Sequence, residues 1–317
     1  MNLATPAKAA STGADTVRAQ LTQGRSDHSG MLFVTLLLAA LMTTVAVLAV
    51  LIADVVIGGW GTLSGRLGDF LSGTLGSQAE TSGLSQAIRG TFYIGVFVVV
   101  FAFPTGIAAA IYLEEYATHG RISKIIDISI RNLAGVPSVV YGILGLTIFV
   151  QSLRGITGPD SNGRSVISAG LTLAILVLPI VIITAAEAVR AVPNGIREAG
   201  YGVGATRWEV VRSHVLPYAA PGILTGTVLA LARALGEAAP LILVGATTGF
   251  LTSGSSYDPS TLQERFTALP TVITTWAGRP GEGYRDTTAA AIVVLLAIVL
   301  VANATAILLR NHYEKKR

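Results

Sequence analysis

The 317-residue sequence contains no cysteine and few charged residues, and both absences exclude classes of protein. Without cysteine the chain can form no disulfide, no thiolate nucleophile and no zinc site with thiolate ligands. Charged residues make up 13% of the chain, about half of the roughly 25% that is usual in soluble domains. Hydrophobic residues make up 51%. This composition favours a protein that is buried largely in lipid.

The sequence also lacks the motifs of several enzyme classes. Its four histidines show neither His-Glu-x-x-His nor i,i+4 spacing, so we expect no metal site. It contains no Gly-x-x-x-x-Gly-Lys-Ser/Thr loop, so the chain does not carry its own ATPase site. The apolar runs hold no paired aspartates and no Ser–His arrangement, which makes an intramembrane enzyme the least favoured class.

Six apolar runs, each of about 20 residues or more, predict an all-α integral membrane protein with about six transmembrane helices. The first run is too long for the core of a signal peptide, so we expect an uncleaved anchor helix. We expect a disordered tail over 1–29, a membrane domain over 30–310 and a short basic tail over 311–317. The runs cover about 31–57, 87–113, 130–150, 166–189, 219–246 and 287–309.

The basic residues flank the apolar runs, which indicates control of membrane topology and not binding of nucleic acid, despite the net charge of +4. With the N-terminus inside, every lysine falls on the cytoplasmic side. The sequence therefore predicts a multi-pass membrane protein with both termini in the cytoplasm and an even number of crossings. The lysines are Lys8, Lys124, Lys315 and Lys316.

Three local features within and beside the runs carry predictions of their own. Gly135 and Pro137 in the third run predict unwound backbone near a cavity, since such irregularity is tolerated only where it faces protein or water. Glu114 and its neighbour Glu115 follow the second run and are expected to form a solvated cytoplasmic edge. Glu187 and Arg190, three residues apart, are expected to pair with each other.

The loop over 190–217 mixes charged and apolar residues and is too polar to cross a membrane. Pro193 and Asn194 can begin a short helix there, because proline is tolerated in a first turn. Such a helix would lie across the membrane face. It could present one side to a groove of a partner protein, or it could be an ordinary interfacial helix.

The fifth run contains two ionisable residues, Arg233 and Glu237, well inside its apolar sequence. An arginine at mid-membrane costs about 2.5–3.5 kcal/mol on insertion scales, so it should face protein or water. The i,i+4 spacing allows the two to pair, either as a structural ion pair or as an anion-handling site. Arginine suits a tetrahedral oxyanion because its planar fork donates two parallel hydrogen bonds. Gly222 and Gly226 fall on the same face and would let another helix approach closely.

The 190–217 loop resembles the EAA loop of ABC-importer permeases of the binding-protein-dependent, MetI-like type. That pattern is Glu-Ala-Ala, three residues, Gly, nine residues, Ile, one residue, Leu-Pro. The matching residues are Glu198, Ala199, Gly204, Leu216 and Pro217, with Gly200 in place of the third alanine and His214 in place of the isoleucine. The resemblance implies a coupling helix that docks on an ATPase subunit. Glu198 would contact the ATPase, Gly204 would allow a turn, and Pro217 would restart the membrane helix.

Three further segments resemble signatures of the phosphate-type permeases within this group. They lie at 132–142, at 230–240, where Ala238 replaces a threonine, and at 268–273. The resemblance implies a subunit that moves phosphate, with Arg233 and Glu237 as transport residues. Some relatives carry an arginine in the fourth helix where this chain has Ile183.

Arg131 and Arg190 are therefore candidates for a second basic residue on the substrate pathway, although both could simply mark helix ends. The implied partners are a second, homologous permease subunit, two ATPase subunits that bind ATP and Mg, an extracytoplasmic phosphate-binding protein and membrane lipid. The chain itself needs no cofactor. The alternatives are a permease for another oxyanion, such as molybdate or sulfate, and a secondary transporter driven by an ion gradient.

Overall fold

The computed structural model describes residues 28–117, 120–246 and 259–314. The expected N-terminal tail lies outside them, apart from its last two residues, which are helical. The chain divides into two compact units, Met1–Asp54 and Val55–Arg317.

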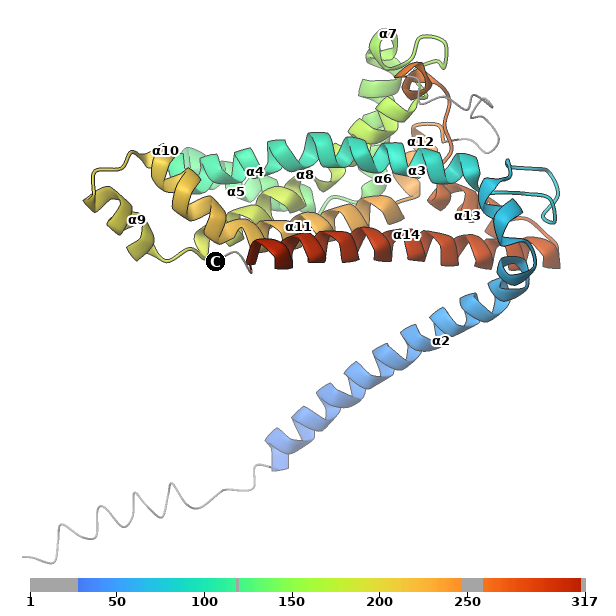
Figure 1. Ribbon diagram of the computed structural model, residues 1–317, viewed down its shortest axis with the longest axis horizontal. Helices are drawn as coiled ribbons and strands as arrows, with labels where there is room; N and C mark the ends of the chain where they lie inside the picture. The colour runs from blue at the N-terminus through green and yellow to red at the C-terminus, as the bar shows by residue number, and fades with distance from the viewer. Residues whose placement is uncertain (1–27, 118–119, 247–258, 315–317) are drawn as a thin grey trace, which may run out of the picture. The chain divides into compact units, whose positions relative to one another are not determined.

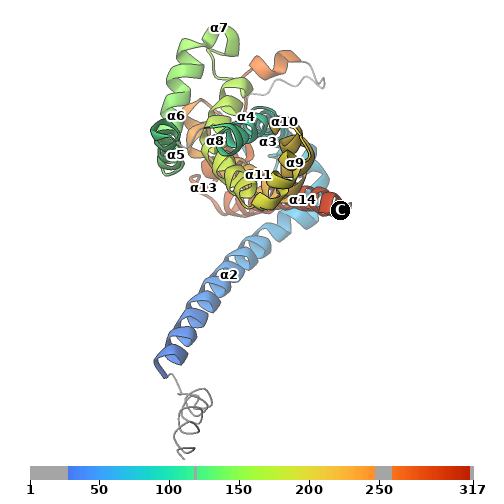
Figure 2. The same cartoon turned by 90° about the vertical axis from the view of Figure 1, so that its left-hand side faces the viewer.

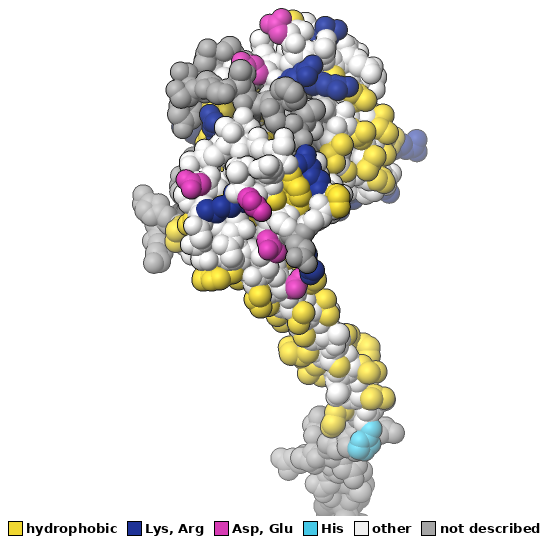
Figure 3. All heavy atoms as spheres, turned by 90° about the vertical axis from the view of Figure 1, so that its right-hand side faces the viewer, with side chains coloured by type: hydrophobic (Ala, Val, Ile, Leu, Met, Phe, Trp, Pro, Cys, Tyr) yellow, Lys and Arg dark blue, Asp and Glu magenta, His cyan; other side chains and the backbone are white. Residues whose placement is uncertain are grey.

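The first unit contributes the start of α2 (His28–Ser72), a helix of 45 residues. Its side chains up to residue 54 are exposed and almost all are uncharged, as the hydrophobic side chains along α2 in Figure 3 show. A helix that is apolar on every side is typical of a membrane span. The first expected run is thus confirmed as a helix.

The part of α2 in the second unit continues past the expected end of the run, as far as Ser72. Its backbone is non-helical at Arg66 (φ −147°, ψ 35°), which marks a kink. The Arg66 guanidinium donates to the carbonyl oxygens of Ala79 (2.6 Å) and Ser82 (3.2 Å). The Arg66 side chain thereby links the end of α2 to residues 79–82 in the segment that follows it. Acidic and basic side chains share the surface at the end of the unit where α2 joins α3 and α13 joins α14 (Figure 3).

Long helices of the second unit lie along one another in Figure 1: α3 with α4, α8, α11 and α14. By length and composition the described residues hold five helices that could cross a membrane, or six if one sharply bent pair is a single span. Three of these helices keep a continuous helical course although they contain a kink or wide π-helical turns. They are His28–Ser72, with its kink at Arg66, and Ser85–Tyr116 and Arg207–Gly236, with π-helical turns. The spans are His28–Ser72, Ser85–Tyr116 (α3 Ser85–Phe97, η1 Val98–Ala102, α4 Phe103–Ile111, η2 Tyr112–Tyr116), α8 (Val166–Arg190), Arg207–Gly236 (α10 Arg207–Val210, η4 Val211–Val215, α11 Leu216–Gly236) and Gly283–Leu308 within α14 (Glu282–Glu314).

The third expected run is not a straight helix. It forms α5 (Arg121–Ala134) and α6 (Ser138–Gly145), which continues as η3 (Leu146–Ser152), and the two directions differ by 99°. The bend falls at residues 135–137, because Pro137 disfavours helical backbone at the residue before it. The irregular backbone expected at Gly135 and Pro137 is therefore confirmed, and the bent pair can count as one span. Figure 2 shows α5 and α6 at one side of the bundle.

The smaller elements lie in the connections between the spans. They are α7 (Arg154–Thr157), α9 (Asn194–Gly202), α12 (Ala239–Leu243), η5 (Pro259–Gln263) and α13 (Leu269–Ala277). α13 buries Leu269, Val272 and Trp276 against α14 and α3. The 268–273 signature thus begins a buried helix.

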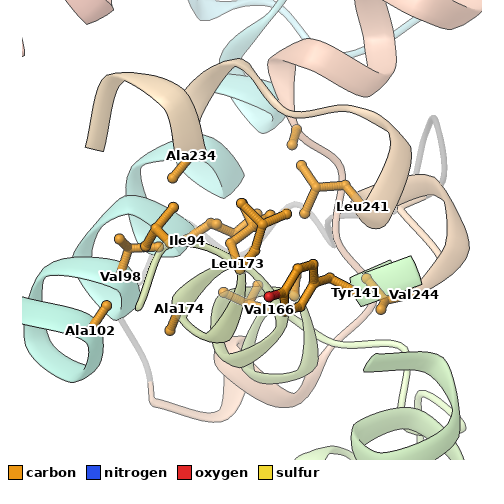
Figure 4. Close-up of a cluster of buried hydrophobic side chains, with 14 of the residues drawn as sticks. Ile94, Val98, Ala102, Tyr141, Val166, Leu173, Ala174, Ala234, Leu241 and Val244 are labelled. Carbon is orange, nitrogen blue, oxygen red and sulfur yellow. The ribbon is translucent and has the colours of Figure 1, made fainter. Parts of the chain in front are cut away.

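The central core forms where α3, α6, α8, α11 and α12 meet. Figure 4 shows Ile94, Leu173, Ala234 and Leu241, one from each of four of these helices, converging on this cluster with Tyr141 of α6. α8 is the most buried span, and α11 packs along it.

The small residues of α11 make its approach to α8 possible. A Cβ atom at Gly222 would lie 2.8 Å from Cβ of Ala188, and one at Gly226 would lie 2.2 Å from Oγ1 of Thr184. Both distances are far below van der Waals contact. The expected close approach of another helix to this face is confirmed, and the partner is α8.

Candidate functional site

The fifth apolar run is broken at the point where its charges lie. α11 ends at Gly236, Glu237 is extended (φ −80°, ψ 119°), and α12 begins at Ala239. Pro240 has no N–H to donate to the carbonyl oxygen of Gly236, so the helical ladder loses a hydrogen bond here, which favours a break. The expected single helix up to residue 246 is therefore wrong, because it is two helices with a short extended link.

Arg233 lies in the last turn of α11 and pairs with Glu237 in the link. Nε of Arg233 is 3.4 Å from Oε1 of Glu237. The expected i,i+4 pair is thus confirmed. The side chain of Arg233 is 46% exposed and that of Glu237 is 19% exposed, so the guanidinium is accessible although it sits in an apolar span.

Neighbouring residues fix the position of this pair. Ala230 and Ala234 are fully buried in the central core and hold the last turn of α11 against it. On the other side of the break, α12 packs mainly against α6. A Cβ atom at Gly142 of α6 would lie 2.7 Å from Cα of Pro240. The break therefore joins two rigidly packed supports, and the pair lies between them.

The 190–217 loop folds as two helices with a tight turn between them. α9 begins at Asn194, directly after Pro193, as the sequence predicts. Gly204 has φ +85°, a left-handed conformation that favours glycine. The turn expected at this glycine is confirmed.

The membrane helix restarts earlier than the resemblance implies. Thr206 caps α10 in a capping box with Glu209, and the helical run is continuous from Arg207 to Gly236. Pro217 lies ten residues inside that run, directly after the wide turn η4, whose geometry tolerates the missing N–H. The helical run thus begins ten residues before the expected restart, although α11 itself begins at Leu216 with Pro217 in its first turn.

The loop presents several exposed residues on its surface. Glu198 and Ala199 of α9 are exposed, and Val203 at the tip is 85% exposed. Tyr201 and Trp208 beside them are exposed aromatic residues. Leu216 is half-buried and packs against the buried cluster around Val210. α9 thus offers one carboxylate within a partly apolar surface, which suits docking to another protein.

The departure from the family pattern at Gly200 has a local steric cause. Gly200 is buried, and a Cβ atom there would lie 2.7 Å from Cγ2 of Val210. An alanine at this position would push α9 away from α10.

We therefore expect Gly200→Ala to destabilise the loop by about 1–3 kcal/mol, the usual effect of overpacking. Gly202→Ala is the matched control, since no atom lies within 4 Å of a Cβ atom at Gly202 in the same helix. Limited proteolysis of the purified protein should cut the 190–217 loop faster in Gly200→Ala only. Equal cleavage rates in the two variants would contradict this explanation.

The two other candidate pathway arginines lie at helix ends and pair with other carboxylates. Arg131, in the last turn of α5, is 3.1 Å from Asp127 and 4.0 Å from Glu187. Arg190, the last residue of α8, forms a bidentate pair with Glu114, with Nε 3.2 Å from Oε2. Among the described residues neither arginine forms an ion pair with Glu237.

The expected pairing of Glu187 with Arg190 is wrong, because Arg190 reaches a carboxylate on another span. A cation at a helix C-terminus is stabilised by the helix dipole, which fits the helix-end interpretation of both arginines.

Glu115 is a residue whose environment the sequence did not predict. It is buried and lies 2.7 Å from Nη2 of Arg197, so the expected solvated edge is wrong at this residue. The two are 82 positions apart. The sequence held two signals for this contact. They were the two adjacent glutamates after an apolar run and the arginines of the 190–217 loop, which was expected on the same side of the membrane.

Comparison with known proteins agrees with this architecture. A family model described as "Binding-protein-dependent transport system inner membrane component" matches residues 102–317. The phosphate transport system permease protein PstA 1 of Mycobacterium tuberculosis is 32% identical over 289 residues, covering 90% of this chain and 88% of that protein. The PstA permease of Xylella fastidiosa is 32% identical over 234 residues, covering 73% and 77%.

Solved structures show the same fold at low identity. A permease chain of a bacterial alginate ABC transporter, in complex with a periplasmic protein that holds an alginate pentasaccharide, superposes with a TM-score of 0.61 at 19% identity, covering 86% of this chain and 92% of that one. A chain of the MetNI methionine ABC transporter gives 0.56 at 16% identity, covering 73% and 97%. The chain belongs to the family of binding-protein-dependent transport system inner membrane components, and it is a multi-pass inner-membrane permease subunit of an ABC importer.

Proposed function

We propose that this permease is one of the two channel-forming subunits of an ATP-driven phosphate importer. The observation that carries the proposal is the accessible Arg233–Glu237 pair at the break between α11 and α12. Relatives whose names state phosphate transport support it. An exposed guanidinium within an apolar helix is expensive unless it faces water or an anion.

Arg233 would bind the anion and Glu237 would balance its charge. The guanidinium keeps its charge at any physiological pH and can donate two parallel hydrogen bonds to a tetrahedral oxyanion. In the structure it is paired with Glu237 instead. An arriving phosphate would compete with that carboxylate, so the pair would open as the anion binds. Glu237 could also accept a hydrogen bond from the P–OH group of hydrogen phosphate, a group that sulfate lacks at neutral pH.

The rest of the machinery would be supplied by other chains. A second homologous permease subunit would complete the pathway, two ATPase subunits would bind ATP and Mg, and an extracytoplasmic binding protein would deliver phosphate. Both termini would lie in the cytoplasm. α9, through Glu198 and the exposed residues beside it, would dock on an ATPase and transmit its closure as alternating access.

Uptake by the reconstituted complex in vesicles tests the proposal. We expect ATP-dependent accumulation of radiolabelled phosphate that a tenfold excess of sulfate or molybdate does not reduce. Accumulation of sulfate or molybdate in place of phosphate would assign the subunit to another oxyanion. Uptake that continues without ATP and stops when the ion gradient collapses would instead indicate a secondary transporter.

A further inference from the structure

The end of the second span holds the 190–217 loop through three consecutive side chains. Each of them contacts a different arginine, one at the end of α8, one in α9 and one in α10. The contacts are the ion pairs Glu114–Arg190 and Glu115–Arg197 and the cation–π contact of Arg207 with the Tyr116 ring, 5.6 Å from its centroid.

The middle contact differs from its neighbours in burial and in the number of partners. The side chains of Glu115 and Arg197 are 4% and 16% exposed. Nε and Nη2 of Arg197 both donate to Oε1 of Glu115, at 3.0 and 2.7 Å. The same guanidinium donates to the carbonyl oxygens of Val189 (2.9 Å) and Val192 (2.6 Å).

One side chain of α9 therefore joins three elements. Val189 is in the last turn of α8 and Val192 lies two residues beyond its end, so Arg197 donates to carbonyl groups at the C-terminus of that helix. Glu115 belongs to the second span. The planar guanidinium, with five donors in fixed directions, can hold all of these acceptors at once, which lysine cannot do.

We propose that the buried Glu115–Arg197 pair is the joint through which a displacement of α9 moves the second span (Ser85–Tyr116) together with α8. The inference rests on the proposed function, because it needs an ATPase that pushes on α9. Arg197 and Glu115 are positioning residues in this account, since they touch neither substrate nor nucleotide.

The packing beyond the joint leads to the candidate anion site. α8 lies close against α11 at Ala188 with Gly222 and at Thr184 with Gly226, where a Cβ atom on either glycine would overlap α8. We infer that a movement of α8 is passed through this packing to α11, which carries Arg233. Coupling of this kind is established by an experiment in which a change at the Glu115–Arg197 pair alters transport at the candidate anion site.

Glutamine replacements at two adjacent positions provide a matched test in the assembled, reconstituted complex. Glu115→Gln removes the buried charge, and Glu114→Gln removes the neighbouring charge, whose side chain is 19% exposed. Phosphate uptake and ATP hydrolysis are measured in the same vesicles. We expect Glu115→Gln to lower the number of phosphates moved per ATP at least tenfold while hydrolysis stays within twofold, and Glu114→Gln to leave the ratio within twofold.

An unchanged number of phosphates moved per ATP in Glu115→Gln would overturn the proposal. An equal loss in both variants would overturn it as well. If Glu115→Gln fails to assemble, Arg197→Lys decides, because it keeps the charge but cannot reach all three acceptors. A lowered ratio in Arg197→Lys supports the joint and a wild-type ratio overturns it. Failure of the proposed function itself is distinguishable, since the wild-type complex would then show no ATP-dependent phosphate uptake.

Discussion

Replacing Arg233 with glutamine is expected to abolish phosphate uptake while the complex still assembles. Glutamine retains a donor but loses the charge and the two-pronged geometry. Hydrogen bonds to charged groups contribute about 1.5–3 kcal/mol each, so the loss of two corresponds to a fall in uptake rate of roughly 100-fold or more. Assembly should survive because the side chain is half exposed and not part of the core. The measurement is initial uptake rate in vesicles, normalised to complex recovered by affinity purification.

Arg233→Lys separates charge from geometry in the same assay. Lysine keeps the positive charge as a single point, so we expect partial uptake, below the wild-type rate and above that of Arg233→Gln. Arg154→Gln, at an exposed arginine of α7, is the control for a general effect of losing a positive charge. Normal transport by Arg233→Gln would exclude Arg233 as the anion-binding residue, and a full rate in Arg233→Lys would refute only the role of the planar fork.

A single methyl group added at Gly226 is expected to disrupt the packing of α11 on α8. In Gly226→Ala the new Cβ atom would lie 2.2 Å from Oγ1 and 2.5 Å from Cβ of Thr184. Protein interiors have no free volume to absorb such an overlap, and overpacking typically destabilises by about 1–3 kcal/mol. We expect the melting temperature of the purified chain to fall by about 5 °C or more, with lower yield in the membrane.

The size exchange Gly226→Ala with Thr184→Gly tests whether this one contact is responsible. It adds one methyl group to α11 and removes the hydroxyethyl side chain from α8, and with it both overlapping atoms. We expect the double variant to melt above Gly226→Ala, although glycine within α8 itself lowers helix stability. Thr184→Gly alone is the control for that effect. A Gly226→Ala protein as stable as the wild type would show that the helices can separate without penalty.

The existence of the spans could be predicted from the sequence, because apolar length is a direct requirement of the bilayer. Their interruptions could be predicted only in part. Gly135 and Pro137 indicated irregular backbone, yet nothing local to them specified a bend of 99°. The break at Glu237 was signalled by Pro240 and its missing N–H, but the apolar run continued past it and was interpreted as one helix.

Ion pairs show the same division between local and long-range information. The i,i+4 pair of Arg233 with Glu237 follows from helix geometry alone and is confirmed. Glu115 and Arg197 meet only after the second span and α9 are placed side by side. Arg190 had a carboxylate three residues away in the sequence, but its position at the end of α8 lets it reach Glu114 on another span.

The arrangement of supports around the break in the fifth helix has a mechanical consequence. The guanidinium of Arg233 moves with α11, whereas Glu237 sits on a link whose far end is held by α6 through Pro240 and Gly142. A small shift of α6 relative to α11 would thus change the separation of the two charges. The electrostatic potential that meets an incoming anion is in this way set by the mutual position of two helices, with no mobile side-chain gate required.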